Sequence, residues 1–221
     1  MNNMKCFLNF ILLIFLSFSC KAELKYPQLI PTDQSNIDPS FKIFKNKLAK
    51  AVELRDSSFI LNHLSNNVMV GFDAESMGID AFRREWQIGN YNSKLWIVLS
   101  DLLKYGCILE KINSTNQFIC PYIHALFPDT IDPAMHIVLL HSNVPIYKGP
   151  SEKTDIILQL DYAILKVIAW KPEGWIKITL PFNNSQTGFV LESKCYTAYD
   201  YRIYFEKFDN SWKISNLLGG D

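Results

Sequence analysis

The 221-residue chain lacks the features that point directly to several large classes of protein. Its 22 basic and 22 acidic side chains cancel, so there is no basic excess of the kind that follows a nucleic-acid backbone. It contains only nine glycines, with no phosphate-binding loop and no dinucleotide fingerprint. We therefore expect no nucleic-acid partner and no cofactor.

Cysteine is also scarce, and its spacing is not that of a metal site. The five cysteines contain no C-x-x-C pair, so we expect no structural metal. Cys107 and Cys120 flank a predicted hairpin whose polar turn, residues 113–116, would set them opposite each other. A cross-strand disulfide and two buried free thiols both agree with that register, and Cys195 then has no partner.

Long apolar runs are absent beyond the N-terminus. The run from Cys6 to Phe18 follows Lys5 and has 13 residues, fewer than the roughly 20 that span a hydrocarbon core. This pattern is typical of a secretory signal peptide, which we assign to residues 1–20. The protein is therefore expected to be exported, to the periplasm or another part of the cell envelope.

The end of this signal, Leu16-Ser17-Phe18-Ser19-Cys20, resembles the cleavage site of a bacterial lipoprotein. The resemblance implies lipidation of Cys20 and a membrane-anchored protein. The pattern departs from the usual one because leucine lies four residues before the cysteine and Phe18 replaces a small residue. Cleavage nearby, releasing a soluble protein, is the alternative.

The region after the signal peptide divides into a tether and a helical part. Residues 21–37 contain Pro27 and Pro31 and no periodic apolar pattern, which predicts a tether. Apolar residues at helical spacing follow within 38–135, with Asp38 or Ser40 as the N-cap of the first helix. We expect a helical α+β N-terminal domain with short β-hairpins over 38–135.

Short apolar segments separated by turn residues follow between Asn143 and Tyr196. They include Asn143-Val144-Pro145-Ile146-Tyr147, Gly174-Trp175-Ile176-Lys177-Ile178 and Thr187-Gly188-Phe189-Val190. This region resembles a bacterial Src homology 3 domain, which implies a small SH3-like β-barrel over 136–197.

The last segment, 198–221, predicts a β-hairpin that turns at Asp209-Asn210. The hairpin could extend the barrel or pack on the N-terminal domain. We favour the second because the five strands of the barrel are already accounted for. The predicted fold class is thus α+β: a helical N-terminal region, an SH3-like barrel and a C-terminal hairpin.

The resemblance also implies binding rather than catalysis, with cell-wall peptide, glycan or an envelope protein as the partner. Aromatic rings are the expected contacts, because extended peptides dock on them. The candidates are Tyr147, Trp170, Trp175 and Tyr196. For Trp175 in particular, packing inside the barrel is the competing interpretation.

Two alternatives stay open. An envelope hydrolase could have its site in the N-terminal domain, near Asp73, Asp80, Arg84 and His63, with the barrel only targeting it. Cys120 with His124 is a weaker nucleophile and base pair. The barrel could instead be a spacer without a ligand. We expect a non-enzymatic binding protein.

Overall fold

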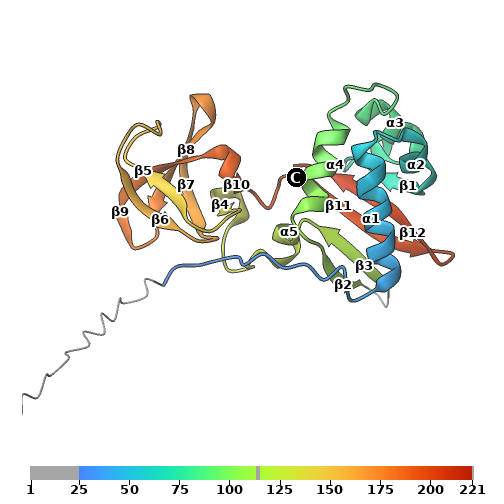
Figure 1. Ribbon diagram of the computed structural model, residues 1–221, viewed down its shortest axis with the longest axis horizontal. Helices are drawn as coiled ribbons and strands as arrows, with labels where there is room; N and C mark the ends of the chain where they lie inside the picture. The colour runs from blue at the N-terminus through green and yellow to red at the C-terminus, as the bar shows by residue number, and fades with distance from the viewer. Residues whose placement is uncertain (1–24, 113–114, 221) are drawn as a thin grey trace, which may run out of the picture.

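The computed structural model describes residues 25–112 and 115–220. Over these residues the chain forms two β-sheets with short helices on and between them (Figure 1). The α-helices are α1 (Pro39–Glu53), α2 (Ser57–Asn62), α3 (Ile79–Trp86), α4 (Leu95–Lys104) and α5 (Tyr122–Leu126). The 3-10 helices are η1 (Ala74–Ser76), η2 (Pro133–Met135), η3 (Pro172–Gly174) and η4 (Glu192–Lys194). The predicted signal peptide and Cys20 lie outside the described residues.

The first sheet has five strands in the order β1-β12-β11-β3-β2. Their bounds are β1 (Leu64–Met69), β2 (Ile108–Ile112), β3 (Thr115–Cys120), β11 (Arg202–Phe208) and β12 (Ser211–Leu218). The C-terminal hairpin, β11–β12, lies inside this sheet: β11 pairs antiparallel with β3, and β12 pairs parallel with β1. Because an isolated hairpin is marginal in water, this pairing on both sides stabilises it.

Helices cover one face of the five-stranded sheet (Figure 1). The Asp38 carboxylate caps α1, accepting hydrogen bonds from the N–H of Ser40 at 2.8 Å and of Phe41 at 3.2 Å. The apolar stripe of α1 then packs against α4 and the sheet. The shared core is rich in large aromatic side chains: Phe41, Phe44, Phe82, Trp86, Trp96, Phe118, Phe205 and Trp212.

The second sheet has seven strands in the order β10-β4-β7-β8-β9-β5-β6. Their bounds are β4 (His136–Leu139), β5 (Val144–Tyr147), β6 (Ile156–Leu160), β7 (Ile164–Lys171), β8 (Trp175–Leu180), β9 (Asn183–Leu191) and β10 (Cys195–Tyr196). Its core is aliphatic, with members such as Ile146, Leu165, Ile178 and Val190 fully or almost fully buried.

The predicted fold class is wrong. The protein is mostly β, the longest helix of the described residues has 15 residues, and the N-terminal part is built on a sheet rather than being a helical region. Within the described residues the seven strands do not close into a barrel, because the sheet ends at β10 and β6. The strand β4 pairs with β7, and β10 pairs with β4, so these two strands extend the sheet at one end.

The segment that precedes α1, residues 25–37, runs along both sheets (Figure 1). We call it the strap; the sequence predicted a tether over 21–37. The N–H of Leu29 donates to the carbonyl of Tyr162 at 2.9 Å, and the N–H of Gln34 donates to the carbonyl of Cys107 at 2.7 Å. A shared apolar cluster also joins the sheets, with members Leu29, Ile108, Tyr122, Ile123, Val138, Leu140 and Ile164. The two sheets therefore pack as neighbours.

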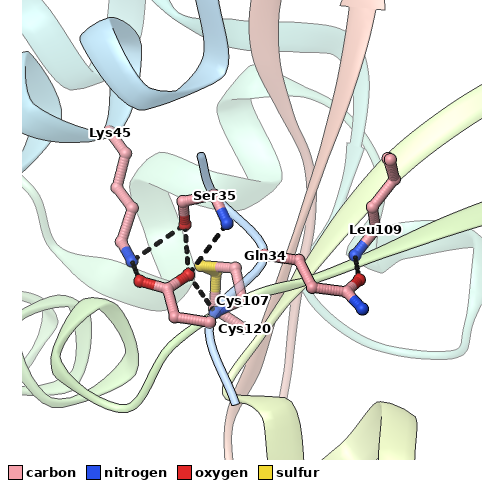
Figure 2. Close-up of a disulfide and its surroundings, with 7 residues drawn as sticks. Gln34, Ser35, Lys45, Cys107, Leu109 and Cys120 are labelled. Carbon is pink, nitrogen blue, oxygen red and sulfur yellow. Dashed lines mark hydrogen bonds and ion pairs between the residues drawn. A yellow bond between two sulfur atoms is a disulfide. The ribbon is translucent and has the colours of Figure 1, made fainter. Parts of the chain in front are cut away.

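A disulfide between Cys107 and Cys120 anchors the far end of the strap (Figure 2). Beside it, Asp33 accepts hydrogen bonds from the N–H of Cys107 at 3.1 Å and from Nζ of Lys45 at 3.1 Å. Ser35 donates to the same carboxylate through its N–H and its hydroxyl. Burial alone would raise the pKa of Asp33, but these hydrogen bonds outweigh it and lower the pKa to about 2.

No described helix is long and apolar enough to cross a membrane.

Candidate ligand-binding cleft

A cleft of about 410 Å³ lies where the end of α4 meets the seven-stranded sheet. Its walls come from α4, β7, η4, β10 and the connection that leads from β10 to β11. The lining includes the side chains of Asp101, Tyr105, Trp170, Glu192, Tyr196 and Asp200. A cleft of this size can hold a small molecule or a few residues of a peptide.

Trp170, one of the predicted contact residues, forms part of this wall. It lies on β7, opposite Ile176 of β8, and keeps 54% of its surface exposed. The other four tryptophans are all buried, at 1% to 6% exposure. An indole face left open to solvent inside a concave surface is available for stacking on a ligand.

Tyr196, a second predicted contact, lines the same cleft from β10. Its phenol donates a hydrogen bond to the carbonyl of Tyr201 at 2.5 Å, and its ring centroid lies 6.2 Å from that of Tyr105. Burial raises the pKa of Tyr196, and the charge of Asp200 adds to the effect. The phenol is therefore neutral at physiological pH, and its hydrogen bond orients the ring.

Three carboxylates make the cleft acidic, and no lysine or arginine belongs to its described lining. Asp200 accepts a hydrogen bond from the N–H of Thr197 at 2.6 Å. Although Asp200 keeps contact with solvent, partial desolvation raises its pKa, and the charge of Glu192 raises it further. Because these carboxylates repel one another, the cleft favours a ligand that brings a positive charge or several hydrogen-bond donors.

Cys195 also lines the cleft, but its thiol is not activated. The thiol donates to the carbonyl of Leu191 at 3.4 Å, and burial raises its pKa, with Glu192 and Asp200 adding to the shift. A thiol nucleophile needs the opposite, a lowered pKa beside a positive charge. Cys195 is therefore part of the wall rather than a reactive group.

The other two predicted contacts, Tyr147 and Trp175, lie elsewhere. Both are buried, at 7% and 6% exposure, and their rings meet edge to face with centroids 5.5 Å apart. The pair therefore packs within the seven-stranded sheet, and sequence alternation did not distinguish such packing from an open face. The acidic contributors Asp101, Glu192 and Asp200 were not predicted, because they come from separate segments with no shared motif.

Three of the four residues proposed for a hydrolase site have local partners. Asp80 pairs with Arg83 at 3.6 Å, and Arg84 donates to the carbonyl of Glu75 at 3.1 Å. His63 stacks on Phe59, with ring centroids 4.1 Å apart. Among the described residues, no three His, Cys, Asp or Glu side chains gather as a metal site would require.

The proposed pairing of Cys120 with His124 is excluded in the oxidised protein, because the sulfur of Cys120 is bonded to Cys107. His124 instead has two other contacts. Its Nδ1 lies 3.2 Å from the carbonyl of Ala198, and its Nε2 lies 2.9 Å from the hydroxyl of Tyr204. Burial lowers the pKa of His124, so a neutral ring that donates at Nδ1 and accepts at Nε2 fits both contacts.

Comparison with known proteins gives little. No protein-family model matches the chain, and no curated protein matches it. A solved structure from Xanthomonas campestris, named for the calcium/calmodulin dependent protein kinase II association domain, is similar over 87% of this chain and 97% of that chain. The identity is 10% and the TM-score 0.30, so this likeness assigns neither a fold nor a function.

Proposed function

We propose that this protein is an exported, non-enzymatic binding protein of the cell envelope, and that its ligand enters the cleft between the two sheets. The partner is cell-wall peptide or glycan, or an envelope protein. The observation that carries the proposal is the meeting of Trp170 and Tyr196 in one concave, acidic surface.

The chemistry of the cleft favours a ligand that carries an amine. The exposed indole of Trp170 attracts a cation through its face, and the carboxylates of Asp101, Glu192 and Asp200 add a negative field. Peptide stems of the cell wall carry free amino groups and an extended backbone. A neutral glycan would use the indole face and leave the carboxylates to accept hydrogen bonds from its hydroxyl groups.

The export part of the proposal rests on residues 1–20, a signal-type sequence that ends at Cys20. If Cys20 is lipidated, the wild-type protein fractionates with membranes and the Cys20→Ser variant does not. If the signal is instead cleaved to release a soluble protein, both forms appear in the soluble envelope fraction.

The test is retention of residues 21–221 on purified peptidoglycan sacculi. We expect the Trp170→Ala variant to be retained less strongly than the wild type, because the variant removes the open stacking surface. The matched control is Tyr91→Ala, which removes an aromatic ring that is 70% exposed and stacks on Arg55, outside the cleft.

Each outcome decides something about the proposal. Weaker retention of Trp170→Ala than of Tyr91→Ala supports the cleft as a wall-binding site. Equal retention of wild type and Trp170→Ala contradicts the cleft. If the wild type itself is not retained, wall binding is wrong and an envelope protein becomes the partner to seek.

A further inference from the structure

A second hollow, of about 730 Å³, lies on the five-stranded sheet where β1 separates from β12. We call it the groove. The two strands pair at Leu64 with Ile214 and at Met69 with Asn216. Between these two pairs β1 has four residues, 65–68, whereas β12 has only one, Ser215. Such an irregularity bends the strand away from its partner and opens space, and bulges often occur beside functional sites.

Ser215 also has no paired residue on β11, the strand on the other side of β12. On β11, Tyr204 pairs with Asn216 and Phe205 pairs with Ile214, so the register passes over Ser215. The side chain is 6% exposed, and its Oγ has no hydrogen-bond partner among the described residues. A buried hydroxyl without a partner destabilises a fold, and in the groove wall a ligand group can supply the missing bond.

Further polar groups of the groove have no partner in the described part of the chain. The side chains of Asn66, Asn216 and Glu206 line it and make no hydrogen bond there. Amide and hydroxyl groups both donate and accept hydrogen bonds, and the Glu206 carboxylate accepts. Phe208, 43% exposed, adds an aromatic face to the lining.

The charges of the groove differ from those of the cleft. The groove is lined by two carboxylates, Glu206 and Asp209, and by one ammonium group, that of Lys213. The Nζ of Lys213 already donates to the carbonyl of Asn62 at 2.6 Å. An anionic ligand would meet two carboxylates and only one committed ammonium group. A neutral ligand rich in hydroxyl groups would find donors, acceptors and an aromatic face together.

We propose that the groove is a binding site for a neutral, polyhydroxylated ligand, that is, an oligosaccharide. Hydroxyl groups of the sugar would bond to Glu206, Asn216 and Ser215, and the apolar face of a ring would pack on Phe208. This site is independent of the cleft and does not rest on Trp170.

The test titrates N-acetylchitotetraose and, separately, maltotetraose into ¹⁵N-labelled residues 21–221 and follows the backbone amide resonances by NMR. We expect shifts confined to residues 65–67, 206–208 and 215–216. Response to N-acetylchitotetraose alone indicates a wall-type glycan, and response to both sugars indicates general recognition of hydroxyl groups. If neither sugar shifts these resonances, the proposal is overturned.

Two variants test the residues themselves. Glu206→Gln should weaken sugar binding about ten-fold, because it removes a charged acceptor. Ser215→Ala should weaken it about five-fold while the melting temperature stays the same or rises, because the variant also removes the unpartnered hydroxyl. Glu110→Gln, on β2 of the same sheet, is the matched control and should bind as the wild type does.

Failure of this proposal can be told apart from failure of the cleft. Trp170→Ala should leave the sugar-induced shifts of the groove residues unchanged even if it weakens retention on sacculi. Sugar affinities that are the same in Glu206→Gln, Ser215→Ala and the wild type would overturn the groove as the site.

Discussion

The two sheets bury different kinds of side chain and gain their stability differently. The core of the five-stranded sheet contains eight large aromatic residues and is covered by helices, whereas none of the eleven buried members of the other core is aromatic. Large rings need long side chains from two layers to enclose them, and α1 and α4 supply the second layer. The aliphatic core is enclosed by residues of the sheet's own strands and the connection between β6 and β7. The larger core, of the first sheet, is therefore built around large rings, and the smaller core, of the second, around aliphatic side chains.

The largest expected effect is the loss of a ring from the aromatic core. Phe41 is fully buried and stacks on Phe118 with ring centroids 3.7 Å apart. We expect Phe41→Ala to lower the free energy of unfolding by about 3–5 kcal/mol. The comparison in the other core is Phe182→Ala, a half-buried ring in the turn between β8 and β9 that meets Tyr26 edge to face, which should cost about 1–2 kcal/mol. Urea unfolding of both variants checks the comparison, and equal losses would contradict it.

The next effect concerns the disulfide, which the five-stranded sheet has and the other sheet lacks among its described residues. Cys107 and Cys120 are 13 residues apart, and closing a loop of that size stabilises a protein by about 3 kcal/mol. The double variant Cys107→Ala, Cys120→Ala should lose about that much in thermal or urea unfolding. Cys195→Ala, which removes a free thiol from the cleft wall, is the control and should change stability far less. A double variant as stable as the wild type would show that the bridge does not stabilise the fold.

A smaller, pH-dependent effect belongs to the strap. The pKa of Asp33 falls from its ordinary value of 3.8 to about 2 in the folded protein. A lowered pKa means that the carboxylate stabilises the fold above about pH 4 and loses this contribution as the pH falls toward 2. Because Asp33 is half-exposed, we expect Asp33→Asn to cost only about 1–2 kcal/mol at pH 7.

Unfolding of wild type and Asp33→Asn across that pH range measures the difference directly. The gap between the two proteins should narrow steadily below pH 4. A gap that stays constant down to pH 2 would mean that the hydrogen bonds of Asp33 do not act through its charge.

Local patterns in the sequence were sufficient to predict several elements. Apolar spacing and a cap at Asp38 or Ser40 predicted α1, and the turn residues Asp209 and Asn210 predicted the β11–β12 hairpin. The hairpin of β2 and β3 was predicted with a register that sets Cys107 opposite Cys120. Each of these features is set by residues that lie close together in the sequence.

The way the strands assemble could not be predicted in the same manner. The pairing of β4 with both β7 and β10 extends the second sheet at one end, and it joins residues far apart in the sequence. The parallel pairing of β1 with β12, which creates the groove, spans most of the chain. Local alternation of apolar residues is compatible with a closed barrel and with an open sheet.

The candidate site was predicted only in part, and the reason is the same. Aromatic residues near turns were reasonable contacts, but alternation did not show that Tyr147 and Trp175 pack on each other. Alternation also did not show that Asp101 on α4 and Trp170 on β7 line the same cleft, because their proximity depends on how the two sheets pack.

Acrylamide quenching of tryptophan fluorescence tests the cleft most directly, because Trp170 alone among the five tryptophans is exposed. We predict a quenchable fraction that disappears in Trp170→Phe and that soluble wall fragments, carrying both peptide and glycan, protect in the wild type. Protection by N-acetylchitotetraose alone would indicate that the cleft takes the glycan, and protection only by fragments that carry peptide would indicate that it takes the peptide. Binding of wall fragments that leaves Trp170 fully open to acrylamide would contradict the cleft as the ligand site.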